Sequence, residues 1–137
     1  MEAPAVTAAA MALPPPAEGT AEAAARVAAA RDLAADRARE LELGPDAALN
    51  ARVSGPDLDR IAAPDEAGRA LMMRAGEAGG LTARGWTRTL KLARTIADLE
   101  GATGVLRRHI AEALAYRRPV HEGPTPSVSV PSSERVF

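Results

Sequence analysis

Residues 82–101 read TARGWTRTLKLARTIADLEG, and this stretch decides the fold. Thr82 has a hydroxyl that can accept a hydrogen bond from the free amides of a helix start, and Gly101 is a typical helix stop. At about 100° per residue, the apolar side chains between them fall on one wide side. These are Trp86, Leu90, Ala93, Ile96, Ala97 and Leu99. The polar side chains on the narrow opposite side are Arg84, Arg88, Lys91 and Asp98. We therefore predict a helix from Thr82 to Glu100 that packs with one face and offers the other to solvent.

Shorter helices are predicted on both sides of this stretch. Asn, Ser, Gly and Pro in residues 50–56 indicate a loop, and a short helix over residues 57–62 follows it. Pro64 suits the first turn of a further helix that ends at Gly79-Gly80. Its expected apolar surface consists of Ala70, Leu71, Met73 and Ala78. The last helix, at about residues 105–117, has the apolar spacing of an element that closes a bundle.

The N-terminal part divides into two segments. Residues 1–19 contain four prolines, which lack an amide donor and have a fixed φ, so we predict an extended linker. A helix over residues 20–41 follows, with Thr20 as its expected N-cap. Its apolar stripe is thin, which predicts a mostly solvated helix outside the core. The stripe consists of Val27, Ala30, Leu33, Ala34 and Leu41.

These patterns predict an all-α protein: a small bundle of four or five helices over residues 20–118, with a disordered tail over residues 119–137. A net charge of −1 gives no global basic field that would indicate nucleic acid. The absence of cysteine excludes disulfides and thiolate chemistry and fits the cytoplasm, where we expect the protein. Glu2 and the run of prolines at 14–16 argue against a signal peptide or a membrane span.

The sequence lacks the motif that nucleotide hydrolysis of the P-loop type requires. That motif, G-x-x-x-x-G-K-[ST], wraps the phosphates with backbone amides, and the only lysine here is Lys91, far from any such glycine frame. His109 and His121 have no companion ligands, so we predict no metal site and read His109 as an ordinary helix residue. We expect no autonomous catalytic residue and no ATP hydrolysis by this chain alone.

Arg84 is the candidate binding residue. It falls in the first turn of the Thr82 helix, where a cation is disfavoured by a few tenths to about 1 kcal/mol. The free amides of a helix start already attract anions, and a guanidinium there would make a convergent phosphate site. The alternative is a solvated arginine, because an exposed Arg at a helix start loses little in water. Spacing alone leaves both interpretations open.

Three runs of sequence carry a resemblance: residues 81–88, residues 92–101 and residues 109–117. Together they resemble the C-terminal domain of magnesium-chelatase-like AAA+ ATPases of the ComM/YifB group, which are ChlI-like. The resemblance implies that the chain is a helical lid, detached or truncated from a ring-forming parent whose AAA+ core binds ATP and magnesium. It further implies that Arg84 is the sensor-2 arginine, which reaches toward the γ-phosphate, and that Thr82 caps its helix.

Two other functions remain open from the sequence. The first is a freestanding interaction module that docks onto a homologous ATPase ring and alters its assembly. The second is a small helical DNA-binding unit, and DNA is also a possible partner of the parent assembly. The arginines and lysine that motivate the second are Arg84, Arg88, Lys91, Arg94, Arg107 and Arg108. Neither hypothesis involves a membrane.

Overall fold

The computed structural model describes residues 18–79 and 81–116. Within these residues the chain forms helices and no strands, apart from one isolated parallel bridge between Pro64 and Val105. The elements are α2 (Thr20–Glu40), the 3-10 turn η1 (Pro45–Ala48), α3 (Gly55–Ile61), α4 (Glu66–Glu77), α5 (Ala83–Leu99) and α6 (Arg107–Ala115). The all-α prediction is therefore confirmed. Most of the predicted linker and the whole predicted tail lie outside the described residues.

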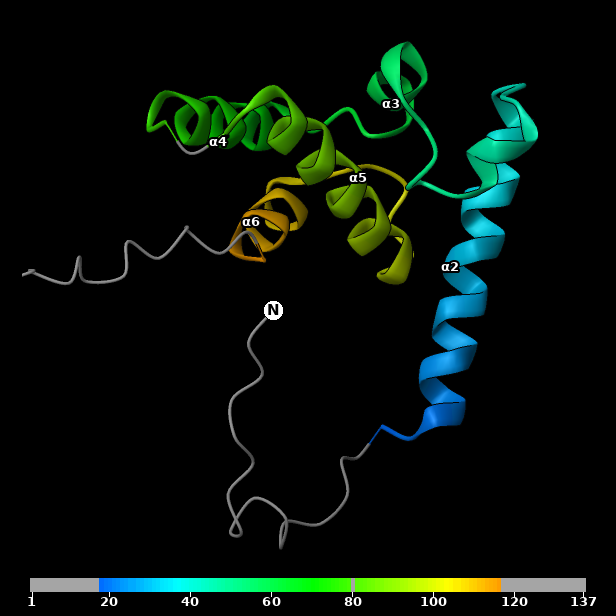
Figure 1. Cartoon of the computed structure of the whole chain (residues 1–137). Helices are drawn as coiled ribbons and strands as arrows, with labels where there is room; N and C mark the ends of the chain where they lie inside the picture. The colour runs from blue at the N-terminus through cyan, green and yellow to red at the C-terminus, as the bar shows by residue number, and fades with distance from the viewer. Residues whose placement is uncertain (1–17, 80, 117–137) are drawn as a thin grey trace, which may run out of the picture.

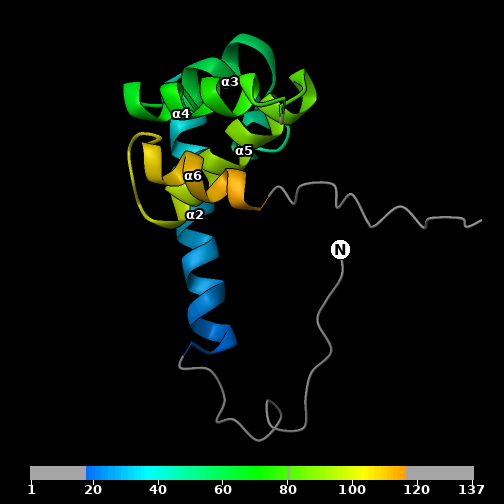
Figure 2. The same ribbon diagram turned by 90° about the vertical axis from the view of Figure 1, so that its left-hand side faces the viewer.

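Helix α5 lies at the centre of the arrangement. It contacts α6, α2 and α3, and α4 packs against α6 (Figure 1). Helix α2 lies along one side, and both ribbon views show its N-terminal half extending away from the other helices (Figure 2). None of the helices in the described part of the chain has the length and apolar character needed to cross a membrane.

The hydrophobic core is centred on the wide apolar side of α5. Leu90, Ala93, Ile96 and Ala97 are buried there, as the sequence predicts. Leu99 was expected on the same side but is 37% exposed, because α5 ends at this residue. The other helices and loops supply the remaining core residues: Val53, Leu58, Ile61, Ala62, Met72, Val105, Ile110 and Ala113. Most of these side chains are aliphatic and small, so the core is small too.

Both ends of α5 form as the sequence predicts. The Thr82 hydroxyl accepts a hydrogen bond from the Gly85 amide at 3.1 Å, so Thr82 is the N-cap. At the other end Gly101 adopts a φ of +72°, which favours glycine, and the Ala102 amide donates to the Ala97 carbonyl at 2.8 Å. The Thr82 cap and the Gly101 stop therefore fix where α5, and with it its apolar face, begins and ends.

Helix α4 starts later than predicted and packs with only part of the predicted apolar set. The predicted start at Pro64 is wrong: Asp65 is the N-cap and accepts from the Gly68 amide at 2.7 Å. The buried residues are Gly68 and Met72, whereas Met73, which we expected to pack, is 52% exposed. The inward face of α4 shares only Leu71 with the predicted set, because Leu71 packs against the core whereas Ala70, Met73 and Ala78 are exposed. Gly68 is part of the inward face because the helix approaches its neighbour closely there.

Helix α2 is mostly exposed, as its thin apolar stripe predicts, but it also has a buried contact. Its C-terminal half packs against α5 and η1 through a row of small side chains. These are Ala30, Ala34 and Ala38. Val27 and Leu33, which we placed in the stripe, are 42% and 41% exposed. The N-cap is Gly19 rather than Thr20. Small residues make the contact because they let the two helix backbones approach closely.

Candidate phosphate-binding hollow beside α5

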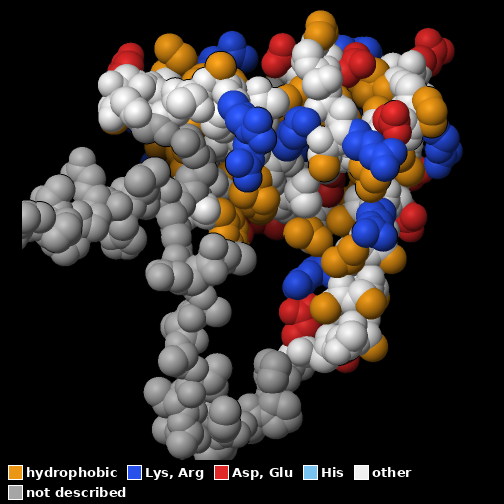
Figure 3. All heavy atoms as spheres, viewed as in Figure 1, with side chains coloured by type: hydrophobic (Ala, Val, Ile, Leu, Met, Phe, Trp, Pro, Cys, Tyr) orange, Lys and Arg blue, Asp and Glu red, His pale blue; other side chains and the backbone are white. Residues whose placement is uncertain are grey.

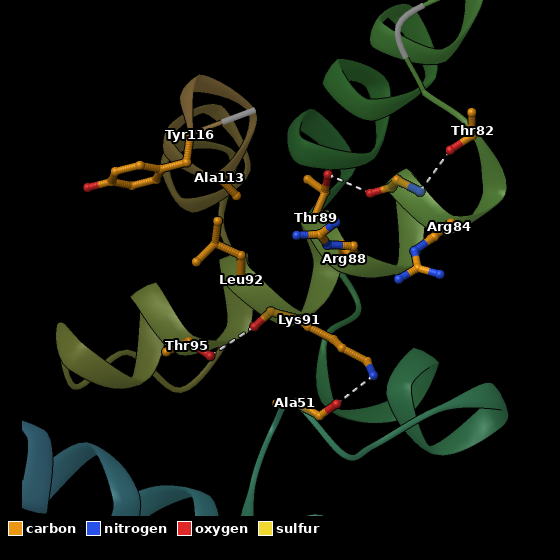
Figure 4. A pocket seen from close by; sticks show the side chains of 11 residues that line it. Ala51, Thr82, Arg84, Arg88, Thr89, Lys91, Leu92, Thr95, Ala113 and Tyr116 are labelled. Carbon is orange, nitrogen blue, oxygen red and sulfur yellow. Dashed lines mark hydrogen bonds between the residues drawn. The ribbon is translucent and has the colours of Figure 1, made fainter. Parts of the chain in front are cut away.

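A hollow of about 800 Å³ lies along the exposed side of α5. Residues of successive α5 turns, from Arg84 to Thr95, form one wall, and Ala113 and Tyr116 of the α6 end lie across from them (Figure 4). Ala51, in the loop before α3, completes the lining at one edge. The hollow is therefore formed by segments that are far apart in the sequence.

The wall of the hollow carries three cations and no carboxylate. Arg84, Arg88 and Lys91 all line it, and no Asp or Glu does so among the described residues. Their spacing of four and then three residues places them on the same helix face. From the viewpoint of Figure 1, Lys and Arg side chains gather over the middle of the bundle, where α5 lies (Figure 3). The hollow is electropositive although the chain has a net charge of −1.

Arg84 is exposed in the first turn of α5, as predicted. This turn holds no acidic residue, whereas the first turns of α2, α3 and α4 each contain one. Within the described residues, no carboxylate forms an ion pair with Arg84. Thr82, also exposed, fixes the start of the helix on which Arg84 stands. The arginine thus stands beside the positive end of the helix dipole.

Lys91 has a structural partner within the hollow. Its Nζ donates a hydrogen bond to the Ala51 carbonyl at 2.7 Å (Figure 4). The ammonium group therefore ties α5 to the loop that precedes α3. Two threonine hydroxyls in this wall donate hydrogen bonds to carbonyls of the preceding helical turn. Thr95 Oγ1 donates to the Lys91 carbonyl and Thr89 Oγ1 to the Gly85 carbonyl, each at 2.9 Å.

The polar stripe of α5 does not remain exposed along its whole length. Asp98, which we predicted on the outward face, is 3% exposed. The Arg37 guanidinium of α2 donates to both carboxylate oxygens of Asp98, at 2.7 and 2.8 Å. Asn50 Nδ2 donates to the same carboxylate at 2.7 Å, and Asn50 Oδ1 accepts a bond from Arg37 at 3.0 Å. Helix α2 covers this end of α5, which is why the prediction for Asp98 is wrong.

Arg94 belongs to the same buried cluster. It is 1% exposed, its Nη2 lies 2.9 Å from Asp98 Oδ1, and the same nitrogen donates to the Ala102 carbonyl at 2.7 Å. Burial lowers the pKa of Arg94 below its usual value, and the Asp98 charge opposes that shift. Its Nε has no hydrogen-bond partner among residues 18–79 and 81–116. Arg94 therefore cannot serve in the basic surface that we considered for DNA.

The spacing of Arg94 and Asp98 was a missed signal. Four residues apart on a helix, an Arg and an Asp can pair, and the pair lies within the quoted stretch. Nothing local shows that α2 will bring Arg37 to the same carboxylate, because the two residues are 61 positions apart. Sequence reasoning therefore missed the buried polar cluster around Asp98.

His109 is fully buried and caps its own helix. The Leu106 amide donates to His109 Nδ1 at 2.9 Å, so the ring proton resides on Nε2 and is donated to Glu100 Oε2, also at 2.9 Å. Arg108 donates to the same carboxylate oxygen. The bond from His109, and then that from Arg108, lowers the pKa of Glu100. His121 lies outside the described residues, and those residues contain no group of His, Cys, Asp and Glu that could hold a metal ion.

Comparison with known families agrees with this architecture. The family model described as "Magnesium chelatase, subunit ChlI C-terminal" matches residues 17–117. The chain belongs to this family. The match runs from just before α2 to just after α6 and includes the hollow. The resemblance expected from residues 81–117 is thereby confirmed.

Individual curated proteins are also similar to this chain. Over 81 residues, or 59% of this chain, it is 32% identical to the competence protein ComM of Haemophilus influenzae. Over 101 residues it is 39% identical to an uncharacterized protein of Mycobacterium tuberculosis, and over 38 residues 50% identical to the uncharacterized protein YifB of Escherichia coli. The chain spans 16%, 19% and 8% of these proteins, respectively. No solved structure matches it significantly.

Proposed function

We propose that the helical bundle is the lid of a magnesium-chelatase-like AAA+ ATPase and that Arg84 is its sensor-2 arginine. In this proposal the ATP lies in the AAA+ core, and the Arg84 guanidinium contacts the γ-phosphate from the lid. The observation that carries it is the position of Arg84: exposed, in the first turn of α5, and lining an electropositive hollow. Membership of the family supports the assignment of the bundle.

The lining of the hollow suits a phosphate chain and does not suit a divalent cation. Arginine forms paired, charge-assisted hydrogen bonds to phosphate oxygens, and helix N-terminal amides add partial positive charge. Magnesium prefers carboxylate and phosphate oxygens, and none of the described lining residues carries a carboxylate. The protein ligands of magnesium would therefore come from the AAA+ core rather than from this domain. The chain alone supplies one side of a nucleotide site.

Arg84 would act on the charge that develops during phosphoryl transfer. A guanidinium held in place before the reaction stabilises negative charge on the transferring group without the cost of reorganising solvent. Thr82 is the positioning residue, because its cap fixes the turn from which Arg84 projects. Loss of the γ-phosphate would remove the anion that Arg84 binds. Hydrolysis would then release the lid from the core.

A chimera tests the proposal. Residues 18–116 would replace the matching C-terminal region of ComM from Haemophilus influenzae, and phosphate release would be measured with Arg84→Ala and with Arg107→Ala. Arg107 is the matched control, because it is an exposed arginine of α6 that does not line the hollow. We expect Arg84→Ala to lower the rate by about 10²-fold and Arg107→Ala to leave it unchanged. Equal rates for the two variants, in a chimera that hydrolyses ATP, would contradict the proposed role.

A further inference from the structure

The hollow contains a second arginine that the sensor-2 role leaves unexplained. Arg88 is exposed and lines the same wall as Arg84, one helical turn further along α5. Four residues correspond to about 6 Å of rise along the helix axis. The two guanidiniums are therefore placed to reach different groups of one extended ligand. In Figure 4 both side chains project from the α5 wall of the hollow.

The charge environment of Arg88 differs from that of most arginines in the described chain. Seven others form an ion pair with a carboxylate: Arg26, Arg37, Arg39, Arg52, Arg60, Arg94 and Arg108. Arg88 has no such partner among the described residues, and Arg84 lies one turn before it. Like charges four residues apart on a helix destabilise it. An anion bound between the two arginines would relieve this repulsion.

Besides Arg84, the hollow has two cations, Arg88 and Lys91, and Arg88 is the more available of them for binding a ligand. The Lys91 ammonium already donates to the Ala51 carbonyl at 2.7 Å, which holds it against the loop before α3. Arg88 makes no side-chain hydrogen bond within the described residues, so its donors are available to a ligand. A planar guanidinium also fits phosphate oxygens with two parallel hydrogen bonds, which an ammonium cannot do.

We propose that Arg88 is a second phosphate-contacting residue of the hollow. Arg84 binds the terminal phosphoryl group of a nucleoside triphosphate, and Arg88 binds the phosphoryl group that precedes it. This inference rests on the proposed function and extends it. The pair of arginines then selects a phosphate chain over a single phosphate, because only a chain reaches both guanidiniums.

The test is a titration of the full chain with inorganic tripolyphosphate and, separately, with orthophosphate. Binding is monitored through the amide NMR chemical shifts, and both titrations use the same low ionic strength. Tripolyphosphate presents linked phosphoryl groups without a base or a sugar, so it isolates the contact in question. The variants are Arg84→Ala, Arg88→Ala and the control Arg107→Ala. Arg88→Lys serves as a second variant, because it keeps the charge and loses the paired geometry. Helical circular dichroism and the melting temperature verify that each variant folds.

We expect Arg84→Ala and Arg88→Ala each to weaken tripolyphosphate binding by about tenfold, and Arg88→Ala to abolish the preference for tripolyphosphate over orthophosphate. Arg88→Lys should recover only part of the affinity. If Arg84→Ala alone weakens binding, the inference about Arg88 is overturned and the proposed role of Arg84 stands. If Arg88→Ala alone does so, the role of Arg84 is overturned and the Arg88 contact stands. Equal weakening by Arg107→Ala, or no saturation, overturns the inference about Arg88, while the role of Arg84 is decided by the chimera.

Discussion

The two halves of α5 use the same residue type in opposite ways. In the N-terminal half Arg84 and Arg88 are exposed and line a hollow whose described lining residues include no carboxylate. In the C-terminal half Arg94 is 1% exposed and pairs with Asp98, which also accepts bonds from Arg37 of α2. The helix pattern is continuous across both halves. The difference arises because α2 covers one half and leaves the other open.

The buried half of α5 is therefore structural, and the exposed half is the part that we propose binds the ligand. A buried charge costs several kcal/mol unless it is paired and hydrogen-bonded, so Asp98 has two arginines and Asn50 around it. Exposed arginines carry no such cost and remain free to meet an anion. Substitutions in the buried half should therefore change stability, and substitutions in the exposed half should change binding.

Asp98→Ala should have the largest effect on stability. The substitution leaves Arg94 and Arg37 without their common carboxylate in a buried position. We expect the free energy of unfolding to fall by about 3–5 kcal/mol, measured by urea denaturation followed by circular dichroism. Asp46→Ala is the control, because Asp46 pairs with Arg52 at the surface. A loss below 1 kcal/mol for Asp98→Ala would break the distinction between the two halves.

Thr82→Ala should have the next largest effect. It removes the hydroxyl that accepts from the Gly85 amide and leaves a helix N-terminal donor without its side-chain partner. We expect a loss of about 1 kcal/mol in the free energy of unfolding, and Thr82→Ser should restore most of it. If Thr82→Ser is as unstable as Thr82→Ala, the threonine methyl group rather than the hydroxyl cap stabilises the fold. Denaturant midpoints of the three proteins make this measurement.

Glu100, just beyond the buried half, gives a pH-dependent prediction. Its pKa is lowered in the folded chain by the bond from His109 and then by that from Arg108. A lowered pKa stabilises the fold above the ordinary Glu value of about 4.3, and this contribution is lost as the pH falls through the folded-state value. On acidification from above the ordinary Glu pKa to below the folded-state pKa, the melting temperature of Glu100→Gln should therefore drop less than that of the unsubstituted chain. The same drop in both proteins would show that Glu100 is not stabilised in this way.

Arg84→Ala should have the smallest effect on stability. A cation in the first turn opposes the helix dipole, and Arg84 has no carboxylate partner among the described residues. We expect the free energy of unfolding to change by no more than about 0.5 kcal/mol, with a gain rather than a loss. Calorimetric melting of the two proteins provides the comparison. A loss above 1 kcal/mol would place Arg84 with the structural residues.

The two ends of α5 and the position of Arg84 could be predicted from local sequence. The Thr82 cap, the Gly101 stop and the outward position of Arg84 all depend on residues close in the chain. The burial of Asp98 could not be predicted in this way, because it depends on Arg37 and Asn50, which α2 and the following loop bring to it.

The alanine contact of α2 was predicted only in part: Ala30 and Ala34 belong to the expected apolar stripe, but neither Ala38 nor the helix that covers them was predicted. Ala30, Ala34 and Ala38 carry little hydrophobic signal, yet their small size is what allows close packing on α5. Larger apolar side chains, Val27 and Leu33, attracted the prediction and proved exposed. Periodicity identifies an apolar face but not the neighbour that will cover it.

The most direct test of the central claim is a cryo-electron microscopy structure of the ComM chimera carrying residues 18–116, with a slowly hydrolysed ATP analogue and magnesium. The account predicts that the Arg84 guanidinium lies within hydrogen-bond distance, about 2.7–3.2 Å, of a γ-phosphate oxygen. A bound nucleotide whose γ-phosphate is contacted only by the core, with Arg84 in solvent, would contradict it.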